Sequence, residues 1–150
     1  MKRVALVAAL LATTAIQIMP ATAASRGSCY TAAALEAEEA IRYMTDLMIV
    51  SSTCKDTVYA EFRLRNKDAI IHYQRALITH FHGSSAFDSW NTTLANESAR
   101  RGAGIPSAQF CRQSIALLNQ AKALDAKAFH DLAAAKAAAA GPEFVRCGRR

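Results

Sequence analysis

The sequence lacks the short motifs by which many enzymes of known chemistry are identified. It has no H-E-x-x-H zinc-protease motif, no G-x-S-x-G nucleophile elbow, no P-loop and no C-x-x-C redox pair. No glutamate is followed by histidine three residues later, which excludes the carboxylate–histidine pattern of metal-binding helical bundles. Attached haem would need C-x-x-C-H, which is absent as well. We therefore expect a non-enzymatic protein with no catalytic residues, no bound metal and no cofactor.

Long apolar runs are also missing, except for one at the N-terminus. The positively charged segment Met1-Lys2-Arg3 precedes an apolar run from Val4 to Ile18, which is shorter than the about 20 residues that a membrane-spanning helix needs. The small residues of Ala21-Thr22-Ala23 then match the site that a signal peptidase cleaves. We predict that residues 1–23 are a cleaved signal peptide. An uncleaved N-terminal anchor is the alternative.

The remaining residues, 24–150, are predicted to form a single helical domain. A bacterial lipobox has a leucine-like residue three positions before its cysteine, whereas Arg26 occupies that position before Cys29. We therefore expect no membrane attachment after the signal peptide is removed. The many alanines favour a bacterial source, so the predicted location is periplasmic or secreted.

No stretch of the chain alternates apolar and polar residues as a strand would. Apolar residues instead recur every three or four positions, and this spacing predicts an all-α fold. Polar breaks and glycines divide the pattern into four predicted helices, at about residues 30–50, 55–82, 85–100 and 106–140. Short connections make neighbouring helices antiparallel, so we expect an antiparallel four-helix bundle.

The four cysteines, Cys29, Cys54, Cys111 and Cys147, all follow the predicted signal peptide. An even number of cysteines in an exported chain is typical of disulfide bonds, and four cysteines imply two of them. A zinc site is the alternative, but no two cysteines have the close C-x₂₋₄-C spacing of such sites. We therefore predict two disulfides, for which three pairings exist.

Helix lengths select one of these pairings. Cys29 and Cys54 lie at opposite ends of the first predicted helix, roughly 37 Å apart, whereas a disulfide requires Cα atoms within about 7 Å. The fourth predicted helix separates Cys111 from Cys147 in the same way. Antiparallel topology then brings Cys54 beside Cys111 at one end of the bundle. It brings Cys29 beside Cys147 at the other end, and we predict these two disulfides.

The four histidines are not spaced as a metal site. His72, His80 and His82 share one predicted helix, but at about 100° per residue their side chains point in three different directions. His130 belongs to another helix and can meet only one of them, so we expect no metal there. The acidic residues of the first predicted helix are expected to form its solvated face. These residues are Glu36, Glu38, Glu39 and Asp46.

The predicted helix at residues 55–82 carries two apolar stripes. Its main stripe includes Phe62 and Tyr73, and a second stripe lies about 180° away. The second stripe consists of Leu64, Ile71 and Ile78, spaced by seven residues. A helix with two apolar stripes packs on both sides. Either it is the central helix of the bundle, or the second stripe is a surface for a homodimer or another protein partner.

These patterns favour a protein that acts by protein–protein interaction through a helical surface, with an unknown partner or a second copy of itself. The alternative is a small-ligand or metal carrier that uses the bundle interior around His80, Tyr73 and Trp90. An enzyme without a recognisable motif is the third possibility. Nucleic-acid binding is not expected, because the net charge of +6 is modest and spread along the chain. The basic residues Arg63, Arg65 and Lys67 are accordingly interpreted as a solvated face.

Overall fold

The computed structural model describes residues 29–148. In this range the chain forms seven helices and no strand, which confirms the predicted all-α class. The helices are α1 (Ala32–Cys54), α2 (Val58–Arg65), α3 (Lys67–His80), α4 (Ser84–Arg101), α5 (Ser107–Gln113), α6 (Ile115–Ala123) and α7 (Ala126–Ala139). None of them is both long and apolar enough to cross a membrane. The predicted signal peptide, residues 1–23, lies outside the described residues.

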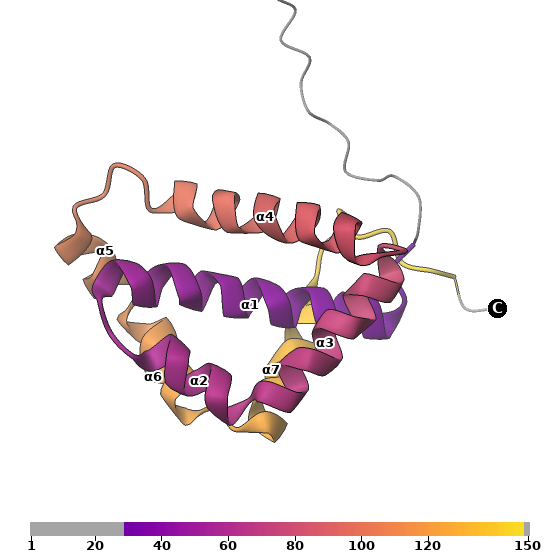
Figure 1. Ribbon diagram of the computed structural model, residues 1–150, viewed down its shortest axis with the longest axis horizontal. Coiled ribbons are helices and arrows are strands. Elements are labelled where there is room, and N and C mark those ends of the chain that lie inside the picture. The colour runs from indigo at the N-terminus through magenta and orange to yellow at the C-terminus, as the bar shows by residue number, and fades with distance from the viewer. Residues whose placement is uncertain (1–28, 149–150) are drawn as a thin grey trace, which may run out of the picture.

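The longest helix, α1, is the centre of the fold (Figure 1). It begins at Thr31, whose side chain accepts a hydrogen bond from the amide of Ala34, and it ends at Lys55, which has a left-handed φ of 57°. Of its 23 residues, 12 are buried, and it contacts every other helix of the described range. Of the two alternatives for the helix at residues 55–82, the central position is not the one observed, because α1 occupies the centre.

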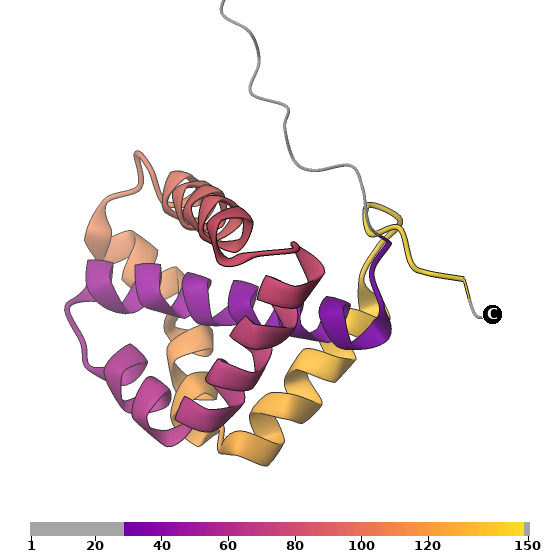
Figure 2. The same ribbon diagram turned by 45° about the vertical axis from the view of Figure 1, so that its right-hand side comes forward.

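Two V-shaped helix pairs lie against α1, and α4 runs along it on another side (Figures 1 and 2). One V consists of α2 and α3, and the other of α6 and α7. The straight helices that we predicted at residues 55–82 and 106–140 are thus broken, the first at Asn66 and the second at Ser114 and again at Leu124. The four predicted segments are correct in order and direction but are not four straight rods.

The breaks at Asn66 and Leu124 stabilise each other across the V-shaped pairs. The Asn66 side chain is fully buried, and its amide donates to the carbonyls of Phe62, at 3.0 Å, and Leu124, at 3.2 Å. Arg65 also donates to the Leu124 carbonyl, at 2.9 Å. Asp125 then starts α7 as its N-cap, because its carboxylate accepts from the amide of Ala128. Each break therefore provides hydrogen-bond partners for the other.

The core lies where both V-shaped pairs meet α1. The rings of Phe62 and Phe129 are fully buried and meet edge to face, with centroids 4.9 Å apart. Tyr43 of α1 and Tyr73 of α3 complete the cluster, at 6.1 Å and 5.6 Å from the Phe129 ring. One aromatic cluster thus joins α1, α2, α3 and α7.

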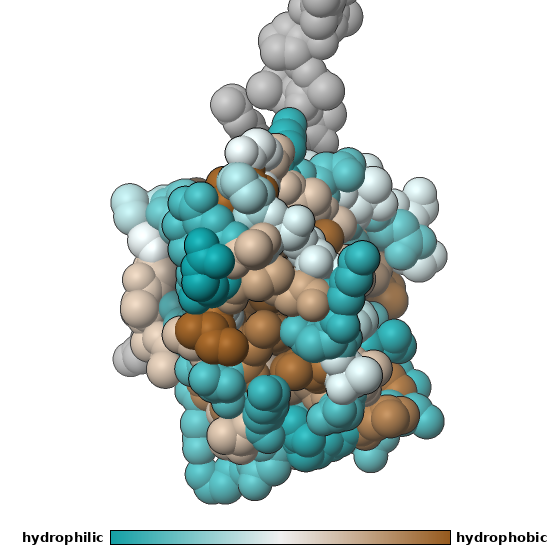
Figure 3. Space-filling model, turned by 90° about the vertical axis from the view of Figure 1, so that its left-hand side faces the viewer, coloured by the Kyte–Doolittle hydropathy of each residue, from teal (hydrophilic) through white to brown (hydrophobic). Residues whose placement is uncertain are grey.

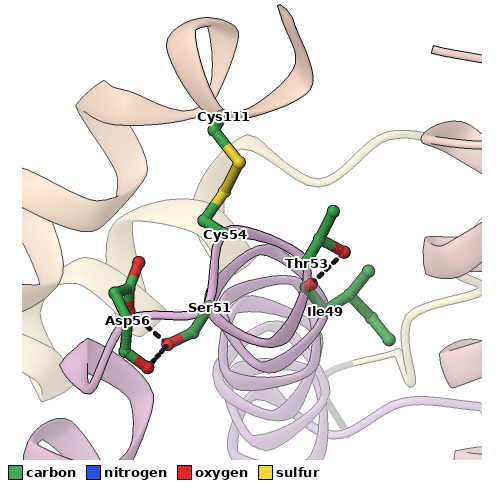
Figure 4. Close-up of a disulfide and its surroundings, with 6 residues drawn as sticks. All are labelled: Ile49, Ser51, Thr53, Cys54, Asp56 and Cys111. Atoms are coloured by element: carbon green, nitrogen blue, oxygen red, sulfur yellow. Dashed lines mark hydrogen bonds between the residues drawn. A yellow bond between two sulfur atoms is a disulfide. The ribbon is translucent and has the colours of Figure 1, made fainter. Parts of the chain in front are cut away.

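Both predicted disulfides are confirmed. Cys54 bonds to Cys111 and joins the end of α1 to α5 (Figure 4). Cys29 bonds to Cys147 at the opposite end of α1. The pairing prediction was correct although the helices are bent, because each segment still ends at the predicted end of α1.

Hydrogen bonds reinforce both ends of α1. Beside Cys54, the buried Ser51 hydroxyl donates to Asp56 and accepts from the amide of Tyr59, which fixes the turn into α2 (Figure 4). Beside Cys29, the amide of Tyr30 donates to the Val145 carbonyl at 2.8 Å, and the amide of Cys147 donates back to the Tyr30 carbonyl at 2.9 Å. The tail of the chain is therefore held against the start of α1.

Candidate functional site

The predicted partner surface of Leu64, Ile71 and Ile78 does not form one continuous stripe. Leu64 lies on α2, whereas the other two lie on α3, beyond the break at Asn66. Leu64 is 81 % exposed, but Ile71 and Ile78 are half-buried, and Ile78 packs against the core. The predicted alignment of the three residues assumes one straight helix over residues 55–82. Leu64 is the one that remains prominent on the surface.

A second exposed apolar residue, Ile115, lies on the neighbouring helix α6 and was not predicted. It is 52 % exposed, although large aliphatic side chains are usually buried. Helices α2 and α6 run in the same direction, because Arg65 at the end of α2 donates to the Ala121 and Leu124 carbonyls at the end of α6. Leu64 is near the end of α2 and Ile115 is the first residue of α6, so Ile115 lies roughly 9 Å nearer the start of the helix pair than Leu64. In the sequence, the exposure of Ile115 is indicated only by its position outside the apolar stripe of its own helix.

Exposed basic side chains lie on the same two helices and at the start of α3. Arg63, Lys67 and Lys122 are exposed, and the Arg63 guanidinium lies 5.6 Å from the centre of the Tyr59 ring. With the exposed Arg65 they make four basic side chains, against three exposed carboxylates in the same region, Glu61, Asp68 and Asp125. We call this surface the α2/α6 face and define it by Leu64, Ile115, Arg63, Lys67 and Lys122. It is an apolar surface with a positive rim.

The structure places His130 in a polar cluster that joins three helices. Its Nδ1 atom lies 2.7 Å from Glu36 Oε1 and 3.1 Å from the Tyr73 hydroxyl. The Tyr73 hydroxyl donates to the same Glu36 oxygen at 2.9 Å. Burial and the Glu36 carboxylate raise the pKa of Tyr73 far above its ordinary value, so the hydroxyl stays protonated and acts as a donor.

The residues predicted to surround an interior ligand, His80, Tyr73 and Trp90, do not meet in one cavity. The His80 ring stacks on Tyr30, with centroids 4.2 Å apart, and Trp90 packs on Phe81 at 5.2 Å. Tyr73 instead points to the polar cluster of Glu36 and to the core ring of Phe129. Within residues 29–148, no three histidine, cysteine or acidic side chains are grouped as a metal site.

The prediction that the acidic residues of α1 form a solvated face is wrong for Glu38, whereas Glu36, Glu39 and Asp46 are partly exposed. Glu38 is only 1 % exposed, and its carboxylate accepts from Arg42 Nε at 3.0 Å and from Nη2 at 2.5 Å. The tail of the chain covers this side of α1, since the Arg42 guanidinium lies 5.6 Å from the ring centre of Phe144. Helical periodicity cannot reveal this cover, because the covering segment has no helical pattern of its own.

A polar groove of about 320 Å³ lies over the middle of α1, between α4, α6 and α7. We call it the α1 groove. Its charged and polar lining is Glu39, Arg42, Tyr43, Asp46, Arg101, Gln120 and Lys136. Tyr43 is buried, its hydroxyl has no hydrogen-bond partner among the described residues, and burial raises its pKa to about 12. Helical periodicity placed two of these residues, Glu39 and Asp46, on one face of the first predicted helix. It gave no indication of which other helices lie over that face.

Glu39 in this groove is expected to destabilise the fold at neutral pH. Burial raises its pKa above the ordinary 4.5, and the fields of Arg42 and Lys136 only partly oppose this. A raised pKa in the folded state means that the stability contributed by Glu39 is complete below its unfolded pKa and is lost as the pH rises through its folded pKa. We therefore expect Glu39→Gln to raise the melting temperature at about pH 7 and to leave it unchanged near pH 4.

Differential scanning calorimetry at both pH values tests this expectation. Asp131→Asn on α7 is the matched control, because this carboxylate is paired with Lys127 on the surface and its pKa is lowered. Its replacement should leave the melting temperature unchanged or lower it slightly at neutral pH. A lower melting temperature for Glu39→Gln at neutral pH would show that the Glu39 carboxylate is stabilising instead.

A second, more apolar groove of about 260 Å³ lies at the end of α1 that carries Cys54. Its walls include Ile49, Ile105 and Phe110. Figure 3 looks onto this end of the molecule and shows hydrophobic surface in its middle with hydrophilic residues around it. Gly102 lets the Phe110 ring close one wall, since a Cβ atom there would lie only 2.8 Å from the ring. This groove contains no charged side chain that would orient a ligand.

Comparison of the chain with protein-family models, curated proteins and solved structures finds no match. The candidate functions of this chain are therefore judged from the properties of its surfaces. The α2/α6 face combines exposed apolar side chains with charge, and the α1 groove combines a hollow with polar side chains. The first suits a macromolecular partner, and the second suits a small molecule.

Proposed function

We propose that this chain is an exported, non-enzymatic protein, periplasmic or secreted, that binds a protein partner through its α2/α6 face. The observation that carries this proposal is the exposure of two large apolar side chains, Leu64 at 81 % and Ile115 at 52 %, on helices that contact each other. Water-exposed apolar area favours burial by roughly 25 cal/mol per Å², so a partner gains free energy by covering both side chains. Such apolar side chains inside a polar rim are typical of interface centres.

Two observations support export. Both disulfides lie in the described domain, and disulfides persist in oxidising compartments rather than in the cytosol. The basic and apolar pattern of residues 1–23 has the features of a signal peptide. Together they favour a protein that acts outside the cytosol.

The charge of the α2/α6 face specifies the chemistry of the partner. The exposed Arg63, Arg65, Lys67 and Lys122 outnumber the neighbouring carboxylates by one, so a partner with an apolar centre and an acidic rim is favoured. A second copy of the chain would bring like charges together across the interface, which disfavours self-association. We therefore propose a different, acidic protein rather than a homodimer.

Charge-introducing variants at the exposed apolar residues test this proposal. Leu64→Glu and Ile115→Glu should leave the circular dichroism spectrum unchanged, because both side chains are exposed. Each should abolish crosslinking of the protein to its partner in envelope extracts of the native host, and weaken binding of the purified partner by about 100-fold. Added salt should also weaken binding.

Val145→Glu is the matched control, since Val145 is 70 % exposed but lies beside the Cys29–Cys147 disulfide. It should leave partner binding unchanged. Binding that survives Leu64→Glu and is lost with Val145→Glu would place the interface elsewhere. Light scattering that shows a dimer disrupted by Leu64→Glu would replace the acidic partner with a second copy.

A further inference from the structure

The α1 groove contains more charged side chains than its own ion pairs use. Arg42 is engaged by the buried Glu38. Arg101 pairs with Asp46, which also accepts from the Ser98 hydroxyl at 2.6 Å. These pairs account for the cations on α1 and α4, and they leave the groove close to electrically neutral on that side.

Two charged side chains remain in the groove without a direct partner in the described range. They are Glu39 of α1 and Lys136 of α7, which line the same hollow but form no ion pair within 4.0 Å. Lys136 acts on Glu39 only through its electrostatic field. The groove thus presents one carboxylate and one ammonium group that are more than 4.0 Å apart.

A third group in the groove also lacks a partner. Tyr43 is 4 % exposed, and its hydroxyl is fully buried and forms no hydrogen bond in the part of the chain described. Leaving a buried hydroxyl unpaired costs about 1 to 3 kcal/mol. Because less than 1 Å² of this oxygen is exposed, a ligand provides the missing partner only when the side chains over the hydroxyl shift as it binds.

We infer that the α1 groove binds a small zwitterion, with an ammonium group at Glu39 and a carboxylate at Lys136. Free amino acids and short peptides are the compounds of this class. The volume of about 320 Å³ is near the lower limit of ligand sites, which suits a ligand of this size. The inference does not depend on the α2/α6 face, because none of the groove residues belongs to that face.

Isothermal titration of the intact protein with free L-amino acids and dipeptides tests the inference. At least one zwitterion should bind with a dissociation constant of about 1 mM or tighter. Its methyl ester, which lacks the carboxylate, and its N-acetyl form, which lacks the ammonium group, should each bind about tenfold or more weakly.

Variants then show which side chain binds the ammonium group of the ligand and which binds its carboxylate. Glu39→Gln should abolish the preference for the free ammonium group, and Lys136→Gln should abolish the preference for the free carboxylate. Tyr43→Phe should weaken binding severalfold while the fold remains intact. The matched control is Lys127→Gln, because Lys127 is on α7 as well but pairs with Asp131 on the surface.

Two results would overturn the inference. One is that none of these compounds binds at millimolar concentrations. The other is that binding is unaffected by both Glu39→Gln and Lys136→Gln, which would place the bound molecule elsewhere. Leu64→Glu should leave zwitterion binding unchanged, so failure at this groove is distinguishable from failure of the proposed partner interaction.

Discussion

Replacing Phe129 with alanine is expected to lower the free energy of unfolding by about 3 to 5 kcal/mol. The Phe129 side chain is fully buried, and its ring meets those of Phe62 and Tyr73 edge to face. It therefore joins α7 to α2 and α3 at the point where both V-shaped pairs meet α1. Removing the ring leaves a cavity that the neighbouring rings, fixed by their own contacts, cannot fill. Urea unfolding followed by circular dichroism measures the loss.

Leu64→Ala is the control for this experiment. The Leu64 side chain is 81 % exposed, so its truncation should change the free energy of unfolding by no more than about 0.5 kcal/mol. Phe129→Leu retains most of the buried volume and should have an intermediate effect. A loss below about 1 kcal/mol for Phe129→Ala would show that the aromatic cluster is not the stabilising core.

Removing either disulfide by paired serine substitution is expected to cost about 4 to 5 kcal/mol. The Cys29–Cys147 bond joins residues 118 positions apart, and the Cys54–Cys111 bond joins residues 57 positions apart. Each bond restricts the unfolded chain, and doubling the length of the closed loop adds only about 0.6 kcal/mol. The two double variants should therefore be destabilised by similar amounts in guanidinium unfolding.

A difference between the two disulfide variants would carry information about the folded state. The Cys29–Cys147 bond holds the tail over Glu38 and Arg42, so its loss also exposes a buried ion pair. If loss of this bond costs much more than loss of the other, the tail contributes stability in addition to the constraint on the unfolded chain. A cost below about 1 kcal/mol for both variants would contradict the entropic account.

The disulfide pairing could be predicted because it depends only on which end of α1 each cysteine reaches. Helix lengths and short connections determine that, and bends within the helices do not change it. The bends themselves depend on hydrogen bonds between distant residues, such as the one from Asn66 to the Leu124 carbonyl. Asp125 was a local cap signal, but the apolar periodicity on both sides of it favoured a continuous helix.

The candidate surfaces were less predictable than the fold. Leu64 was identified because it lies opposite the core stripe of its helix, a property of local sequence. Ile71 and Ile78 were grouped with it only on the assumption of a straight helix. The α1 groove could not be predicted, because its walls come from α1, α4, α6 and α7, and their relative placement is a tertiary property. Burial of Glu38 was missed for the same reason.

The central position of α1 has a consequence for how the protein unfolds. Every other helix of the described range packs on α1, and the two V-shaped pairs share one aromatic cluster against it. No subset of helices therefore keeps its apolar side covered once α1 has left. We therefore expect the described helices not to separate into units, or foldons, that open one at a time as in larger proteins and repeat arrays. The native state should accordingly be lost in a single cooperative transition.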